Sequence, residues 1–213
     1  MDSVVGGIVS SLIATIIWAL LVLLFSPKFI RFIKKMMVSL MDSGTAYIFK
    51  SYKSDEFIED LDKEIKSAKR IWICASRGTF LMEQPYRKYL NQLDIPICVL
   101  LPDINSDVWL KLRTKEVSTS GAGYTEEAFK EAITSSCLFL KVCKGKVKLK
   151  SYNCVHIGRL IMTDRVAYFV PYLSDTYGED VAVYKYTANS TKYKWVERIF
   201  MEMWESQDLR RKE

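Results

Sequence analysis

The chain has 213 residues, of which 49% are hydrophobic and 26% are charged. This composition excludes a disordered chain and allows one folded domain with an appended segment. The net charge of +6 lies mainly in residues 1–53, so the remainder is not expected to bind polyanions in general. Five cysteines without a C-x-x-C pair, and a single histidine, predict reduced thiols and argue against a zinc site.

The N-terminal segment has no charged residue from Ser3 to Ser26. A helix of roughly 22 such residues spans about 33 Å, close to the thickness of a bilayer core. A cleaved signal peptide is disfavoured because no basic residue precedes the run and no A-x-A site follows it. The sequence therefore predicts a transmembrane helix over residues 1–26. Basic residues after it place the C-terminal domain in the cytoplasm, as in a single-pass protein of the cell inner membrane.

Two further features of residues 1–53 suggest assembly at that membrane. Small residues at close-packing spacing predict self-association of the helix into a homo-oligomer: Gly7, Ser10, Ser11 and Ala14. Residues 27–53 predict a basic amphipathic helix followed by a connector. The sequence leaves open whether this second helix contacts lipid or protein.

Residues 54–213 are predicted to form a cytoplasmic α/β domain in which a mixed sheet carries helices on both faces. Hydrophobic periodicity predicts helices over residues 55–69, 84–93, 106–112, 125–140 and 191–206. It predicts strands over residues 71–75, 96–101, 146–152, 156–163, 166–170 and 181–186.

Within this domain, residues 55–206 resemble one half of the phospholipase D superfamily fold. The family's strand motif, H-x-K-x4-D, is matched in a degenerate form by "IGRLIMTD". Ile157 stands at the histidine position, Arg159 at the lysine position and Asp164 at the aspartate position. The family's later acidic residue matches Glu179, and the closing "FMEMWES" is similar to the family's final helix.

The resemblance implies a phosphodiesterase frame without its nucleophile. Members of the family attack phosphorus with the motif histidine, and an isoleucine side chain cannot do so. His156 is adjacent, but on a strand it points to the opposite face unless a bulge turns it back. A catalytically inactive domain, or pseudoenzyme, without a cofactor or metal is therefore expected. Arg159 keeps a positive charge that can hold phosphate.

The candidate ligand-binding residues cluster around Arg159 and the loop after the first strand of the domain. They are Ser76, Arg77, Thr79, His156, Arg159, Asp164, Tyr172 and Glu179. An ordinary surface loop is the competing interpretation for Ser76, Arg77 and Thr79. A second basic feature, on one face of the strand over residues 146–152, either faces phosphates or protects a sheet edge: Lys144, Lys146, Lys148 and Lys150.

The sequence therefore predicts a membrane-anchored, inactive phospholipase D-like sensor or effector. It is expected to be oligomeric and to bind a phosphorylated or nucleotide ligand or a protein partner. This layout resembles membrane effectors of bacterial anti-phage (antiviral) defence, by architecture alone. Two alternatives stay open: a membrane-tethered phosphodiesterase acting on nucleic acid or phospholipid, and a structural anchor that recruits a cytoplasmic partner.

Overall fold

The computed structural model describes residues 44–119, 125–155, 157–172 and 181–210, and seven scattered residues before residue 34. The chain divides into two compact units, Met1–Asp42 and Ser43–Glu213. The second unit contains every element described below.

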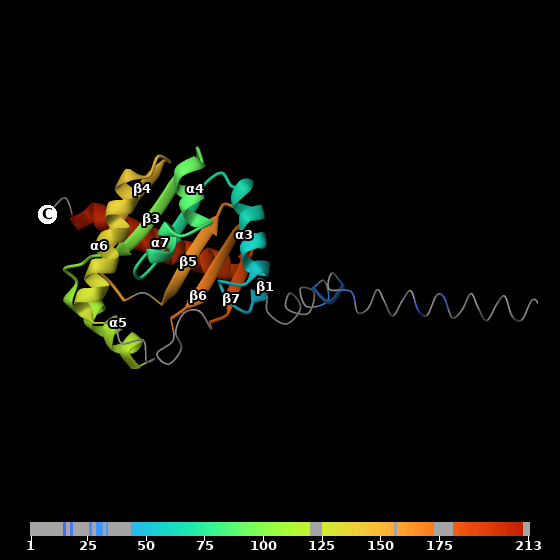
Figure 1. Ribbon diagram of the computed structural model, residues 1–213, viewed down its shortest axis with the longest axis horizontal. Coiled ribbons are helices and arrows are strands. Elements are labelled where there is room, and N and C mark those ends of the chain that lie inside the picture. Colours follow the sequence, from blue (N-terminus) through green and yellow to red (C-terminus); the bar gives the residue numbers. More distant parts are fainter. Residues whose placement is uncertain are drawn as a thin grey trace, which may run out of the picture. The chain divides into compact units, whose positions relative to one another are not determined.

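A mixed sheet forms the centre of this unit (Figure 1). Its seven described strands lie in the order β1-β7-β6-β5-β2-β3-β4. The strands β2, β3 and β4 are parallel, and the other neighbours are antiparallel. Their bounds are β1 Thr45–Phe49, β2 Ile71–Cys74, β3 Ile97–Pro102, β4 Val147–Tyr152, β5 Gly158–Thr163, β6 Val166–Pro171 and β7 Val183–Thr187.

Helices cover both faces of the sheet. Figure 1 shows α3, α4 and α6 in front of the sheet and α7 behind it. The bounds are α3 Asp55–Lys66, the 3₁₀ turn η1 Thr79–Met82, α4 Tyr86–Gln92, α5 Asp107–Thr119, α6 Glu126–Val142 and α7 Thr191–Arg210. The arrangement is a three-layer α/β unit.

Hydroxyl side chains begin three of the helices. Ser54 accepts a hydrogen bond from the N–H of Phe57 at the start of α3, and Thr125 accepts one from Ala128 at the start of α6. Ser190 accepts one from the N–H of Tyr193 at 3.0 Å, as the sequence predicts for the last helix. Each such cap satisfies a backbone donor that has no partner inside the helix, and removing it typically costs about 1 kcal/mol.

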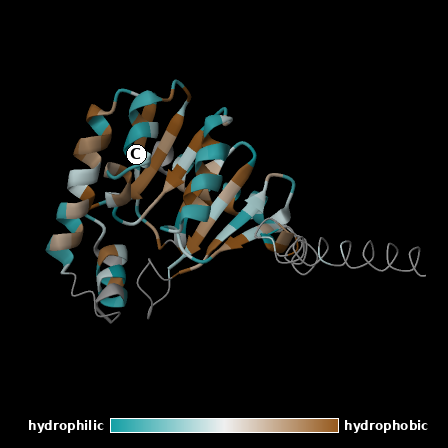
Figure 2. Ribbon diagram, turned by 45° about the vertical axis from the view of Figure 1, so that its right-hand side comes forward, coloured by the Kyte–Doolittle hydropathy of each residue, from teal (hydrophilic) through white to brown (hydrophobic). Residues whose placement is uncertain are grey.

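The core consists of two apolar layers, one on each side of the sheet. In front, the apolar stripe of α3 is buried at Phe57, Leu61 and Ile65. Figure 2 shows the mostly hydrophobic strands between helices whose outer sides are largely hydrophilic. Behind the sheet, the rings of Trp72, Phe200 and Trp204 stack in turn, with centroids 5.5 and 5.8 Å apart. Burial of large apolar side chains, at about 1.5–3 kcal/mol each, holds the layers together.

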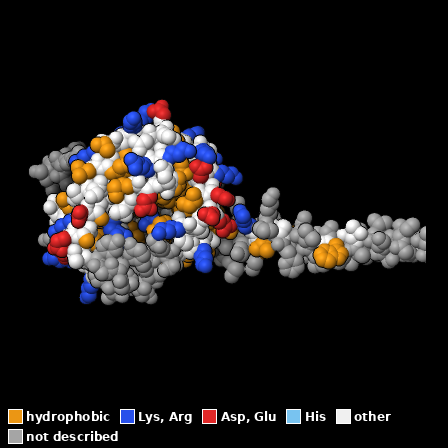
Figure 3. Space-filling model, in the orientation of Figure 1, with side chains coloured by type: hydrophobic (Ala, Val, Ile, Leu, Met, Phe, Trp, Pro, Cys, Tyr) orange, Lys and Arg blue, Asp and Glu red, His pale blue; other side chains and the backbone are white. Residues whose placement is uncertain are grey.

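Charged side chains are scattered over the face of the domain seen in Figure 3, with hydrophobic side chains among them. On α6, Leu138 and Val142 lie one helical turn apart and are exposed by 60% and 75%. The opposite side of α6 buries Phe129, Ile133 and Leu140 against the rest of the domain. This helix therefore has apolar residues on both sides, which explains why its amphipathic period is weaker in the sequence than that of α3.

Strands β5 and β6 approach each other very closely at Gly158, where β5 begins. A Cβ atom on Gly158 would lie 2.3 Å from Cε2 of Phe169 and 2.5 Å from the carbonyl oxygen of Val170. Only glycine fits there without moving the neighbouring strand β6. The close contact fixes the position of the next residue, Arg159, at the start of β5.

Most predicted elements of the second unit are present, with shifted ends. Residues 45–49, expected in a connector, instead form strand β1 against β7. Helix α5 runs to Thr119, beyond the predicted end at residue 112, and α7 extends to Arg210. The β1 segment is too short for its own period to be decisive, and pairing with β7 determines its structure.

The predicted transmembrane helix and inner-membrane location are corrected by the structure. Within the described residues, no helix is both long enough and apolar enough to cross a membrane. The predicted span over residues 1–26 lies largely outside these residues, as do the predicted packing residues Gly7, Ser10, Ser11 and Ala14. An apolar run is not decisive by itself, because a helix apolar on all sides is also found in protein interiors.

Candidate anion-binding site

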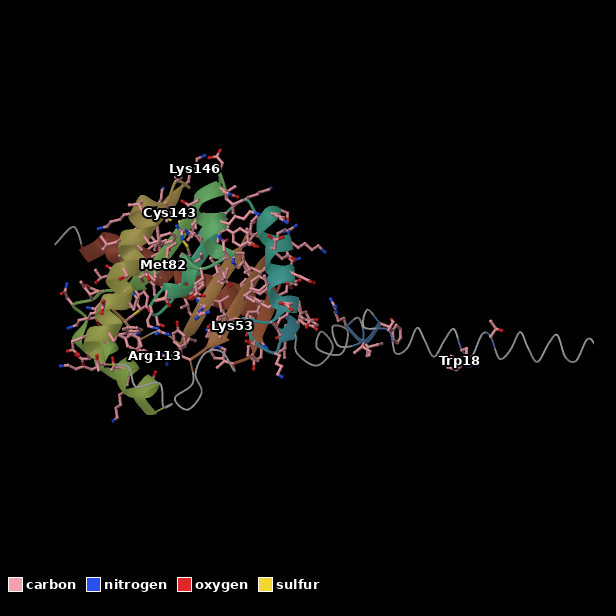
Figure 4. All side chains as sticks on the ribbon, in the orientation of Figure 1. Trp18, Lys53, Met82, Arg113, Cys143 and Lys146 are labelled. Carbon is pink, nitrogen blue, oxygen red and sulfur yellow. The ribbon has the colours of Figure 1, made fainter. Side chains whose placement is uncertain are left out.

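Several loops meet at one edge of the sheet, where β2, β3 and β6 end and β5 begins. Cys74 at the end of β2 pairs with Leu160 of β5, and Gly158 pairs with Pro171 at the end of β6. Figure 4 places Arg113 and Lys53 toward this end of the sheet and Lys146 at the opposite end. In open α/β sheets, ligands commonly bind outside the carboxyl ends of the parallel strands.

Arg159 lies at this edge, as the second residue of β5. Its guanidinium carbon is 4.3 Å from the ring centroid of Tyr52 and 4.3 Å from that of Phe80. Its Nε and Nη1 atoms are buried and have no hydrogen-bond partner. Among the described residues, therefore, two aromatic rings contact this cation but no acceptor binds either nitrogen.

Tyr86, at the start of α4, adds a neutral donor near Arg159. Its side chain is buried, and its hydroxyl also has no hydrogen-bond partner. Burial raises the pKa of Tyr86 above its ordinary value, and the charge of Arg159 acts in the opposite direction. The phenol is therefore protonated at neutral pH and can donate to a ligand.

Tyr172 connects the strand ends at this edge. Its hydroxyl accepts a hydrogen bond from the N–H of Ser76 at 2.9 Å, and its own N–H donates to the carbonyl of Ile157 at 2.9 Å. The guanidinium carbon of Arg113 lies 4.0 Å from the Tyr172 ring centroid. Burial raises the pKa of Tyr172, whereas the charges of Arg159 and Arg113 oppose that rise.

Arg113 is a second buried cation at this edge. It belongs to α5, and only 9% of the residue is exposed. Its Nη1 atom pairs with Glu116 at 2.7 Å, while its Nε atom is buried without a partner. The two guanidinium groups on either side of the Tyr172 network therefore both retain buried nitrogens without a hydrogen-bond partner.

The loop after β2 comes to the same edge, as the sequence predicts. Ser76 is tied to Tyr172, and Arg77 lies 5.5 Å from the ring centroid of Phe129. Gly78 adopts a left-handed conformation with φ of 75°, which turns the chain into η1 at Thr79. The structure thus brings Ser76, Tyr172 and Arg159 together, with Arg77 and Thr79 in the adjoining turn.

Other predicted site residues lie elsewhere. Asp164 follows the far end of β5, roughly 17 Å along the strand from Arg159. There its side chain accepts a hydrogen bond from the N–H of Lys69 at 2.8 Å. Asp164 therefore closes a turn and does not join the site. His156 and Glu179 lie outside the described residues.

The predicted basic strip lies on and beside β4, which is an edge strand. Lys146 pairs with Asp94 at 2.9 Å, and Lys150 donates to the carbonyl of Trp204 at 3.1 Å. Lys148 alternates with the inward residues of the strand, and Lys144 precedes it. Whether the four lysines face phosphates or protect the sheet edge stays a prediction.

Four residues of the candidate site were not among the predicted ones. Tyr52, Phe80 and Tyr86 gave no sequence signal, because each lies in a different short segment. Arg113 had one signal: it follows the buried residues Trp109 and Leu110 at helical spacing. An arginine on the apolar face of a helix indicates a buried cation that needs a partner.

The site is suited to binding anions. Its described groups include two guanidinium cations and a protonated phenol. The described part of the chain contains no cluster of three or more His, Cys, Asp or Glu residues able to hold a metal ion. The chemistry that these donors share is the recognition of oxygen atoms that carry negative charge.

Comparison with known proteins does not show a family for this chain. No protein-family model matches it, and no curated protein matches it significantly. One solved structure that resembles it is that of TrmBL2, an archaeal chromatin protein with a novel mode of DNA binding. The TM-score is 0.43 and the identity 13%, over 96% of this chain and 66% of the other. At these values the likeness carries no argument about function.

The predicted phospholipase D-like fold class and role as an antiviral-defence effector are also corrected. The observed fold is a seven-stranded mixed α/β sheet, and neither it nor the comparisons support those two predictions. The physical reason is that one degenerate strand motif is too short to specify a fold. A mixed sheet, in turn, does not specify a function, because such sheets serve many functions. The resemblance stays a prediction, and nothing below rests on it.

Proposed function

We propose that residues 43–213 form a binding module for a phosphorylated ligand, such as a nucleotide, and that Arg159 holds a phosphate group of that ligand. The observation that supports this most is that Nε and Nη1 of Arg159 are buried without an acceptor. Buried polar groups in folded proteins are nearly always paired, so such atoms call for a specific explanation.

The energy balance at Arg159 favours a bound anion. A guanidinium has five N–H donors and no acceptor, so each of its buried nitrogens needs an acceptor from another group. Each buried donor without an acceptor costs about 1–3 kcal/mol. The contacts with the Tyr52 and Phe80 rings return about 0.5–2 kcal/mol each. An anion that accepts from Nε or from Nη1 removes part of the first cost and keeps the second gain.

The geometry favours an oxyanion over a stacked ring as the group that meets Arg159. Two aromatic rings of the protein already contact the guanidinium. The N–H groups point within its plane, where oxygen atoms of a phosphate can accept them. The Tyr86 hydroxyl supplies another donor beside the cation. Donors on different groups suit a phosphate, which has more oxygen atoms than a carboxylate.

Thermal unfolding of the full chain tests this proposal. The chain is titrated with inorganic phosphate, adenosine 5′-monophosphate and adenosine 5′-diphosphate, with acetate as the carboxylate arm, at constant ionic strength. A ligand present at about 100 times its dissociation constant stabilises the folded state by about 2.7 kcal/mol. We expect the melting temperature to rise by several degrees with at least one phosphate compound and not with acetate.

Two arginine variants separate a site from general charge attraction. Arg159→Met keeps an unbranched apolar side chain against the rings but removes the donors, and it should lose the stabilisation. Arg198→Met removes an equal charge from the exposed surface of α7, where the arginine side chain is 70% exposed, and should retain it. Equal shifts in both variants, or no shift of the wild-type chain with any phosphate compound, would contradict the proposal.

A further inference from the structure

The buried side-chain atoms without hydrogen-bond partners gather around one part of the fold. In the described part of the chain they belong to four residues: Tyr86, Arg113, Thr114 and Arg159. These residues lie at the starts of β5 and α4 and in α5. Unsatisfied buried groups in a folded domain call for a specific explanation, and two of these residues are arginines that lie near Tyr172, which points to a ligand larger than one anion.

Arg113 is built as a binding group and not as a surface arginine. It is nine-tenths buried, its guanidinium lies on the Tyr172 ring at 4.0 Å, and its Nε has no partner. Glu116, whose side chain is 33% exposed, accepts from Nη1. A guanidinium carries five N–H donors, so a single acid at one nitrogen leaves capacity for a second acceptor.

Tyr172 places the two arginines in one site. Its ring contacts Arg113, and its hydroxyl is fixed to the backbone of Ser76 at 2.9 Å. Arg159 pairs in the sheet with Val170, two residues before Tyr172. The two cations therefore lie near the same tyrosine and come from different elements, β5 and α5.

We propose that the site takes a ligand with two phosphate groups, one held by Arg159 and the other by Arg113. This inference rests on the proposed function, because it assigns the second half of the same site. The ligand class is a bisphosphate. One phosphate accepts from Arg159 in β5, and the second accepts from Nε of Arg113 in α5.

Matched pairs of compounds test the second half of the site in the full chain. Adenosine 3′,5′-bisphosphate is compared with adenosine 5′-monophosphate, and fructose 1,6-bisphosphate with fructose 6-phosphate, by titration calorimetry at fixed ionic strength. In at least one pair, the bisphosphate should bind at least tenfold more tightly. Arg113→Gln should reduce that ratio to near one, because the second phosphate loses the group that holds it. Arg159→Met should weaken both compounds.

A second variant keeps the test decisive if Arg113→Gln does not fold. Glu116→Gln removes the acid that binds Nη1 of Arg113, so it should raise bisphosphate affinity severalfold and leave the monophosphate unchanged. The inference is overturned if no bisphosphate is preferred by the wild-type chain, or if both variants leave the ratio unchanged. Monophosphate binding that persists in those cases keeps the proposed function, whereas loss of all binding by the wild-type chain overturns both.

Discussion

The hydroxyl of Tyr172 accepts a hydrogen bond from the backbone N–H of Ser76 across 96 positions of sequence. This bond connects the end of β6 to the loop after β2. Both segments lie beside the start of β5, which contains Arg159. The ring that carries the hydroxyl also contacts Arg113. The position of both arginines therefore depends on one tyrosine that holds three segments together.

Tyr172→Phe should destabilise the domain while leaving its packing intact. The substitution removes the hydroxyl and leaves the N–H of Ser76 without this acceptor, which typically costs about 1–3 kcal/mol. Urea unfolding should show a lower midpoint with an unchanged slope. The exposed substitution Ser135→Ala on α6 serves as a control and should stay within about 0.5 kcal/mol of the wild type. An unchanged midpoint for Tyr172→Phe would show that the bond does not contribute.

Arg159→Met should not destabilise the unliganded protein, although it alters a partly buried residue in a strand. Removing two unsatisfied donors gains about 1–3 kcal/mol each, while the lost contacts with Tyr52 and Phe80 cost about 0.5–2 kcal/mol each. We expect a free energy of unfolding between the wild-type value and about 2 kcal/mol above it. Calorimetric melting in a phosphate-free buffer measures this. A clear loss of stability would mean that the cation is already satisfied in the folded chain.

Asp60→Asn should be costly because Asp60 anchors a charged network between α3 and the sheet. Its carboxylate accepts from the Tyr168 hydroxyl at 2.6 Å and from Lys185 at 2.7 and 2.9 Å. Lys185 is 9% exposed and also pairs with Glu64 at 3.0 Å, so the neutral amide leaves a buried cation with one acid. We expect a loss of about 1–3 kcal/mol in urea unfolding.

The matched comparison for Asp60 is an exposed ion pair on α7. Glu202 lies 4.0 Å from Arg198, and both side chains are about 70% exposed. Glu202→Gln should change stability by less than about 0.5 kcal/mol, because solvent screens such pairs. Equal effects of the two substitutions would show that the Asp60 network behaves as a surface pair.

Asp62 should contribute to the acid sensitivity of the domain. A hydrogen bond from Lys66, and another from the Tyr89 hydroxyl at 2.8 Å, lower the pKa of Asp62 below its ordinary value of 3.8. A lowered folded-state pKa adds stability above pH 3.8, and that stability is lost as the pH falls through the folded-state value. Asp62→Asn should therefore be less stable than the wild type at pH 6, with the difference shrinking below about pH 3. Urea midpoints at the two pH values measure this, and a constant difference would contradict it.

Local chemistry determined much of the domain from sequence alone. The stripe at Phe57, Leu61 and Ile65 predicts α3, and Ser190 predicts the start of α7, because period and capping depend on residues within a few positions. The buried strands follow from short apolar runs, whereas Arg159 was singled out by its place in a degenerate phospholipase D-like motif. The apolar run near the N-terminus did not decide whether a membrane is crossed, since hydropathy does not identify what covers a helix.

The tertiary structure alone decided which residues meet Arg159. Tyr52, Phe80 and Tyr86 lie in different segments, and the fold built on the strand order β1-β7-β6-β5-β2-β3-β4 brings these segments to Arg159. The same order separates Asp164 from Arg159, although only four residues lie between them, because a strand carries its two ends to opposite edges of the sheet. The sequence thus identified the cation Arg159, and long-range strand pairing determined which side chains surround it.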